Sequence, residues 1–354
     1  MSRLFVRVFA ALLLAGTSLA AIAAPPKATS SHPGLIWRGD LATARPLMED
    51  LAKAWQKTAH GRITVQAFST LSGLDALANG SADFAGSARS AFAKRGEEAS
   101  LNFVPVAWDA LVMAVHAGNP VGNVSLKQLH DIYYGRIDNW KALGGPDRPI
   151  NLYSVASPLD GVEYSLREYL FRRGNQPVAS PRLYINTAQL EAAIRLDPNA
   201  LGVTTLSSII EDKKLHMLAV EGVAPSPANV ADGSYPLYMP LYLVLPPAGA
   251  HAETVKAFME FLGSDKARKI LLAHHVLPYD PTTPLAQERP QHLLAMQDIS
   301  SPPRNGPVAA PGATYAAGAT RAPNSPLTAA ARARLEKQRA EQAANKDTAT
   351  PPAQ

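Results

Sequence analysis

Cysteine is missing from all 354 residues of the chain. Its absence excludes disulfide bonds, thiolate metal sites and a cysteine nucleophile, and it leaves no residue for lipid attachment after a leader peptide. Charge is also modest, because 34 Lys and Arg residues against 29 Asp and Glu residues leave a formal net charge of +5. No dense basic cluster with interleaved aromatic residues accompanies this charge, so we expect no nucleic-acid partner.

Long apolar segments are lacking after the first part of the chain. A membrane-spanning helix needs ~20 consecutive apolar residues, and no segment beyond residue 24 provides them. The first 24 residues combine Arg3 and Arg7, an apolar run over 8–19 and small residues at the end. This pattern predicts a cleaved signal peptide over 1–24 and a mature protein in the periplasm.

The common catalytic motifs are absent as well. The chain has no Walker loop, no His-Glu-x-x-His, no Gly-x-Ser-x-Gly and no Gly-x-Gly-x-x-Gly. His274 and His275 are adjacent, and neighbouring residues of a helix do not share a face, so no metal site is predicted from this pair. We expect no cofactor and no enzyme, and a phosphate-ester hydrolase is the weakest of the functions considered.

Strands and helices alternate at the start of the predicted mature chain. Strands are expected over 35–38, 63–65 and 82–86, with one helix beginning at Pro46 and another over 73–79. This order is typical of a parallel sheet with helices on its faces. The other expected elements are strands over 103–115, 150–155, 202–204 and 235–245 and helices over 126–135, 161–171, 190–194, 252–262 and 264–272.

The composition changes near the C-terminus. Pro and Ala dominate from about 300 to 328, and the residues after them carry no apolar stripe with which a helix could dock. The sequence predicts a mostly disordered tail over 281–354, with room for an isolated helix at about 327–346.

Residues 66–89 read as a strand end, a turn rich in hydroxyl groups, a short helix and a second strand that ends in Ser87 and Arg89. The start of a helix presents unpaired N–H groups and the positive end of the dipole, and both favour an anion. An arginine at the next strand end adds two-pronged recognition of such an anion. The alternative is an ordinary capped helix followed by a surface arginine.

Several segments carry patterns of one protein family. Residues 82–89 match its Ala-Asp-Ile-Ala-x-Ser-Arg strand, and residues 132–140 match its Ile-Phe-x-Gly-Lys-Ile-x-Asn-Trp segment. Residues 105–112 are similar to its Pro-x-Ala-x-Asp-Gly strand, and residues 222–242 continue the likeness. Over about 35–280, the chain resembles the PstS-like phosphate-binding periplasmic substrate-binding proteins of ABC transporters.

The resemblance implies an α/β fold with two lobes and a small anion enclosed between them. Lobe one would comprise residues 35–112 and 241–280, and lobe two residues 113–240. The apolar strands 106–115 and 237–245 would cross between the lobes, and contacts of the ligand with both lobes would close the hinge. We expect a monomer whose partner is a membrane permease or another periplasmic protein.

The resemblance also implies a set of ligand-binding residues. Half of them carry hydroxyl groups, and the others are one arginine, two aspartates and a glycine at a helix start. The matching positions are Thr43, Thr70, Ser72, Ser87, Arg89, Asp109, Asp160 and Gly161.

The chain departs from the family pattern at several of the ligand loops. Asp40 stands where a Ser or Thr is usual, and Leu71 replaces a glycine whose missing side chain lets the backbone approach the anion. In the loop of lobe two, Val155 replaces the arginine, Asp160 the serine and Val162 the threonine. This loop therefore lacks the strongest partner of an oxyanion and presents a repulsive carboxylate instead.

Two functions follow from these patterns. The first is a periplasmic solute-binding protein that captures phosphate or another small oxyanion for an ABC transporter. The alternative is a binding-protein fold that serves as an exported interaction or assembly protein, with a degenerate cleft or a different ligand. The changed loop of lobe two and the long tail motivate this alternative.

Overall fold

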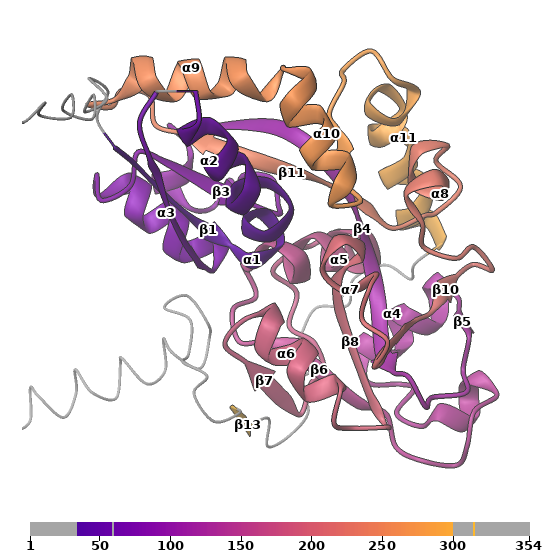
Figure 1. Ribbon diagram of the computed structural model, residues 1–354. Helices are drawn as coiled ribbons and strands as arrows, with labels where there is room; N and C mark the ends of the chain where they lie inside the picture. The colour runs from indigo at the N-terminus through magenta and orange to yellow at the C-terminus, as the bar shows by residue number, and fades with distance from the viewer. Residues whose placement is uncertain (1–33, 59, 300–313, 316–354) are drawn as a thin grey trace, which may run out of the picture.

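The computed structural model describes residues 34–58, 60–299 and 314–315, and it shows an α/β protein with two lobes (Figure 1). The predicted signal peptide and the predicted helix at about 327–346 lie outside these residues. Among the helices in the described ranges, none is both long and apolar enough to cross a membrane.

Lobe one begins with the predicted alternation of strands and helices, which is confirmed. Its first strand pairs in parallel with the second on one side and with the third on the other. The elements are β1 (Leu35–Asp40), the continuous helical segment α1 (Leu41–Thr43), η1 (Ala44–Met48) and α2 (Glu49–Gln56), then β2 (Ile63–Phe68), α3 (Thr70–Ala78) and β3 (Phe84–Ser87).

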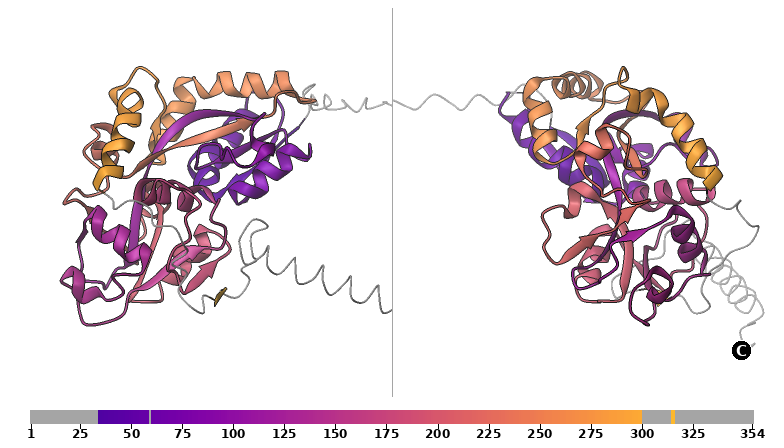
Figure 2. Two further views of the ribbon diagram at one scale, coloured as in Figure 1. Left: turned by 180° about the vertical axis from the view of Figure 1, so that it is seen from behind. Right: turned by 90° about the vertical axis from the view of Figure 1, so that its right-hand side faces the viewer.

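One long strand, β4 (Asn102–His116), belongs to both lobes. Its first part pairs antiparallel with β11 (Tyr238–Leu245), and its second part pairs antiparallel with β8 (Ala200–Thr205). Apolar side chains fill both faces of its middle, where residues 110–115 are fully buried. The two further views show this strand running from one lobe into the other (Figure 2). The long apolar strand predicted from the sequence is thereby confirmed.

Lobe two surrounds the second part of β4. Its helix α4 (Leu126–Tyr134) begins with a capping box between Ser125 and Gln128, and it ends at Gly135, whose φ of 85° suits glycine. The other elements used below are β6 (Asn151–Val155), α5 (Gly161–Phe171), β7 (Arg182–Tyr184), α6 (Thr187–Ile194) and α7 (Leu206–Ile209).

The chain then returns to lobe one as α9 (Ala252–Leu262) and α10 (Asp265–Ala273), and β12 (Leu277–Pro278) pairs with β4. After β12 the structure differs from the sequence prediction, because residues 284–299 of the expected disordered tail form the helix α11 (Pro284–Ile299).

Helix α11 packs against α4 and α5 of lobe two. It docks partly through polar residues: His292 Nε2 lies 2.7 Å from the carbonyl oxygen of Pro236, and the guanidinium of Arg289 lies 6.0 Å from the ring centre of Trp108. A search for an apolar stripe therefore misses this helix. Its position gives the lobes a third connection.

Candidate anion-binding site between the lobes

Asp40 lies at the end of β1 and caps the helical segment that follows. Its Oδ1 accepts the N–H of Thr43 at 2.8 Å and the hydroxyl of Thr43 at 2.9 Å. This is the ordinary role of an aspartate before a helix. Its other oxygen reaches further, because Oδ2 accepts the hydroxyl of Thr70 at 2.5 Å and the N–H of Ala88 at 2.9 Å. The carboxylate of Asp40 is thus surrounded by donors from three turns of lobe one.

These donors meet because β1, β2 and β3 are parallel, which places their carboxyl ends at one edge of the sheet. Packing at this edge is close. A Cβ atom on Gly86 would lie 2.4 Å from Oγ1 of Thr43, and one on Gly73 would lie 2.5 Å from the carbonyl oxygen of Arg38. Glycine at both positions lets the strand ends and helix α3 approach until the hydroxyl groups converge.

Lobe two meets this edge with the start of α5. The N–H of Gly161 donates to Oγ1 of Thr70 at 3.0 Å, and the N–H of Thr70 donates to Oδ1 of Asp160 at 3.2 Å. Ser165 adds a hydrogen bond of 2.8 Å to the carbonyl oxygen of Ala88. Thr70 therefore connects the carboxyl groups of both lobes. We call the following set the junction cluster: Asp40, Thr43, Thr70, Ala88, Asp160 and Gly161.

The junction cluster holds two buried carboxyl groups, since Asp40 is 4% exposed and Asp160 is 3% exposed. Burial raises the pKa of Asp40 in spite of its hydrogen bonds. Burial also raises the pKa of Asp160 to about 7, and the neighbouring charge of Asp40 adds to this rise. Within the described part of the chain, neither carboxyl group has an ion pair with Lys or Arg. The cluster thus opposes a second negative charge near neutral pH.

The comparisons with known proteins place this chain in a family. A model of the PBP superfamily domain matches residues 42–266, which is more than half of the chain. The chain belongs to the PBP superfamily. SphX of Synechococcus elongatus is 26% identical to this chain over 272 residues, and the match covers 71% of this chain and 80% of SphX. The phosphate-binding protein PstS of Bacillus subtilis is 28% identical over 250 residues, covering 70% of this chain and 78% of PstS.

Solved structures agree with this assignment to the PBP superfamily. A Clostridium perfringens protein assigned as a phosphate ABC transporter substrate-binding protein, with bound phosphate, has a TM-score of 0.63 at 25% identity and covers 70% of this chain and 100% of that one. An ABC-type phosphate transport receptor from Vibrio cholerae has a TM-score of 0.55 at 28% identity and covers 69% and 99%. The two-lobed fold and the PstS-like resemblance are confirmed.

In this PBP superfamily member the guanidinium of Arg89 is bonded to other protein groups and forms no hydrogen bond with the junction cluster. Its guanidinium is fully buried and forms a two-pronged ion pair with Glu98, with N–O distances of 2.6 and 2.8 Å. It also donates to the carbonyl oxygens of Ser90 and Leu159, both at 2.8 Å. Four hydrogen bonds are thus made by a group with five N–H donors, and the bond to Leu159 joins the two lobes.

Three other predicted ligand residues form hydrogen bonds with protein groups outside the junction cluster. Ser72 forms the capping box of α3 with Ser69, and the hydroxyl of Ser87 donates to the carbonyl oxygen of Arg89. Asp109 lies in β4, where its partners are the N–H of Ala110 and both the N–H and the hydroxyl of Ser207. The structure brings together Thr43, Thr70, Asp160 and Gly161 of the predicted set.

Sequence reasoning missed two members of the junction cluster as ligand groups. The N–H of Ala88 leaves no trace in a side-chain pattern, because every residue except proline has one. Asp40 did leave a signal, since it stands where the resemblance implies a hydroxyl residue. That departure marks the one carboxylate that the hydroxyl groups of Thr43 and Thr70 surround.

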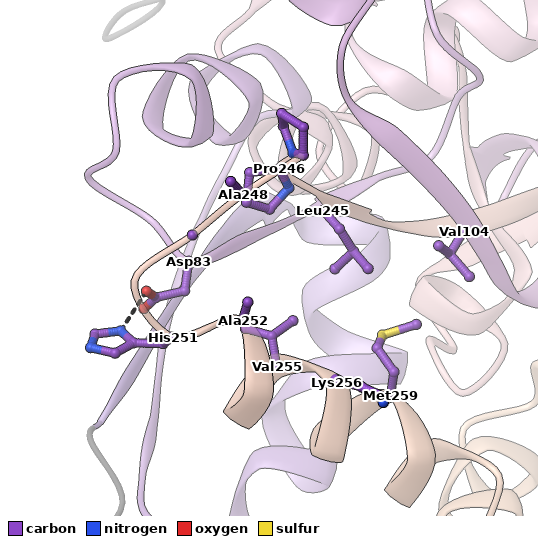
Figure 3. A pocket seen from close by; sticks show the side chains of 12 residues that line it. Asp83, Val104, Leu245, Pro246, Ala248, His251, Ala252, Val255, Lys256 and Met259 are labelled. Carbon is purple, nitrogen blue, oxygen red and sulfur yellow. Dashed lines mark hydrogen bonds and ion pairs between the residues drawn. The ribbon is translucent and has the colours of Figure 1, made fainter.

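Two surface hollows lie near the lobes but outside the cluster. One, of about 330 Å³, lies in lobe one beside the start of α9, where Leu245, Val255 and Met259 form an apolar wall next to a hydrogen bond of 2.7 Å between His251 Nδ1 and Asp83 (Figure 3). The other, of about 380 Å³, lies between the lobes and is lined by seven residues, which are Phe92, Lys94, Arg95, Glu97, Pro158, Leu159 and Asn175.

Gly161→Ala is expected to part the two lobes. A Cβ atom at this position would lie 2.8 Å from the backbone nitrogen and the Cβ of Ala88 in lobe one, so the lobes would have to separate. Alanine suits the first turn of α5, and we expect folding stability to change by less than ~1 kcal/mol. The distance between spin labels on Lys57→Cys and Lys141→Cys would measure the separation, and the cysteine-free chain offers no competing thiol.

Gly96→Ala is the matched control, because nothing lies within 4 Å of a Cβ atom built there. It should leave the distance between the labels as in the parent protein. An unchanged distance in Gly161→Ala would contradict the close contact between the lobes at this position.

Proposed function

We propose that this protein is exported to the periplasm, where it captures phosphate or another small oxyanion between its lobes and delivers it to the permease of an ABC transporter. The relatives support this proposal through their names, since one is a phosphate-binding protein and another is an ABC-type phosphate transport receptor. Membership of the PBP superfamily supports a binding role rather than catalysis.

The observation that carries the proposal is the set of donors in the junction cluster. Thr43 contributes its N–H and hydroxyl, Thr70 its hydroxyl and Ala88 its N–H, and all of them bind the oxygens of one carboxylate. A carboxylate is itself an oxyanion, so these donors have the directions that an oxyanion requires. The N–H of Gly161, at the positive end of α5, approaches from lobe two.

The hollow between the lobes supports an approach route for the anion. Lys94 of lobe one lines it opposite Pro158 and Leu159 of lobe two, and Leu159 directly precedes Asp160. Arg95 lines it too but is already paired with Asp75 and Glu98, so Lys94 is the cation that can attract a small anion here.

Calorimetry and thermal unfolding of the mature protein with phosphate, sulfate and nitrate test this function. We expect heat of binding for at least one of these oxyanions. A ligand at a hundred times its Kd stabilises the folded state by about 2.7 kcal/mol, so the unfolding temperature should rise. The absence of both heat and a thermal shift at millimolar concentrations would reject the proposal and favour an exported interaction protein with a degenerate cleft.

A further inference from the structure

The place of an oxyanion in the junction cluster is already filled by a part of the protein. Both oxygens of Asp40 have two donors each, and all four hydrogen bonds are between 2.5 and 2.9 Å. The side chain is buried, as are those of Thr43 and Thr70, which have no exposed surface. An external oxyanion that used the same donors would have to move this carboxylate away.

The residues that bind the Asp40 carboxylate also contact lobe two. Thr70 donates its hydroxyl to Asp40 and at the same time accepts the N–H of Gly161 from lobe two. The hydroxyl hydrogen of Thr70 points at Oδ2 of Asp40. The lone pairs of the Thr70 oxygen are therefore free to accept a hydrogen bond from lobe two. In a solute-binding protein the bound ligand supplies this kind of link between the lobes.

We infer that the carboxylate of Asp40 is an internal occupant of the oxyanion site, which holds the lobes together without ligand and competes with any oxyanion that enters. This inference rests on the proposed function for its second half, because the competing ligand is the oxyanion that the cluster would bind. Asp40 is then the residue that lowers the affinity of the site and selects for ligands that can displace it.

The negative charge near the site has a consequence for the ligand. A doubly charged oxyanion that entered while Asp40 and Asp160 remained nearby would meet one or two carboxylates, because the buried arginines of the described residues pair with Glu98 and Glu163 instead.

Asp40→Ser tests the inference. Serine is as good a helix cap as aspartate, so the helical segment is retained while the position of Oδ2 is vacated. We expect phosphate, measured by calorimetry on the full mature chain, to bind Asp40→Ser at least tenfold more tightly than the parent protein. With spin labels on Lys57→Cys and Lys141→Cys, the variant should show a longer distance without ligand and the parent distance with phosphate.

Asp40→Asn is the second variant, because it keeps the size of the side chain while it removes the charge and replaces one of the two acceptor oxygens with a donor. It should lie between the parent protein and Asp40→Ser in phosphate affinity. Asp138→Ser removes an exposed carboxyl group of lobe two and controls for the change in net charge, so its affinity and its label distance should equal those of the parent protein.

The outcomes separate this inference from the proposed function. If Asp40→Ser opens without ligand and neither protein binds phosphate, the internal occupant is supported and phosphate capture is rejected. If the parent protein binds phosphate and Asp40→Ser binds it more weakly, Asp40 is a ligand contact, and the inference is overturned while the function stands. An Asp40→Ser protein that stays as closed as the parent and binds no more tightly also overturns it.

Discussion

Glu98→Ala is expected to lower the free energy of unfolding by about 3–5 kcal/mol, because it leaves the guanidinium of Arg89 buried without its counter-charge. Glu98 is 2% exposed and Arg89 is fully buried. The carboxylate of Glu98 also accepts the N–H of Phe92 at 2.8 Å, and its pKa is lowered by Arg89 although burial opposes this. One substitution thus removes an ion pair and a loop contact together. Urea-induced unfolding would measure the loss.

The adjacent residue provides a matched control. The side chain of Glu97 is 62% exposed, and its nearest contact with Arg95 is a long one of 3.9 Å. Glu97→Ala should therefore change the free energy of unfolding by less than ~1 kcal/mol. The double variant with Arg89→Ala and Glu98→Ala should lose less than the sum of the two single losses, because no unpaired charge remains. Equal effects of Glu98→Ala and Glu97→Ala would contradict the buried ion pair.

This ion pair illustrates what the sequence could and could not predict about the site. Ser87 and Arg89 were expected at a strand end, and β3 does end at Ser87. A strand end does not determine where a long side chain turns, however. Arg89 points toward Glu98, which lies in the single 3-10 turn Gly96–Glu98, and so short an element has no periodic pattern that would link the two residues. The predicted anion ligand is therefore a buried support of the junction between the lobes.

The fold was predictable to a greater extent than the site because hydrophobic periodicity and capping residues act locally. Ser125, Gly135 and the apolar run of β4 mark their elements without help from distant residues. Helix α11 was not predictable in this way, since Arg289 and His292 acquire their partners only when the helix lies against β4 and the chain before β11. Likewise, the donors around Asp40 come from three turns that only the sheet brings together.

The stability of this protein is expected to fall as the pH rises from 5 to 8, and Asp109 is a main cause. Burial in β4 raises the pKa of Asp109 from 3.8 to about 7, although hydrogen bonds from Ser207 and Ala110 oppose the rise. Because the folded state holds this proton more tightly than the unfolded state, the contribution is fully present below pH ~4 and is lost as the pH rises through about 7. Over pH 5 to 8 this loss amounts to about 3 kcal/mol.

Asp109→Asn isolates this contribution, since an amide can accept from the same N–H groups and donate to the hydroxyl of Ser207. Its stability, measured by urea unfolding, should change with pH by about 3 kcal/mol less than that of the parent protein. Asp160 acts in the same direction as Asp109, and His130, whose pKa is lowered by burial, acts in the opposite direction. Both are common to the two proteins and cancel in the difference. Asp138→Asn removes an exposed carboxyl group, and its stability should keep the pH dependence of the parent protein. If Asp109→Asn retained it too, Asp109 would be ionised in the folded protein at pH 5, and its carboxylate would be stabilised in β4 by its hydrogen bonds despite burial.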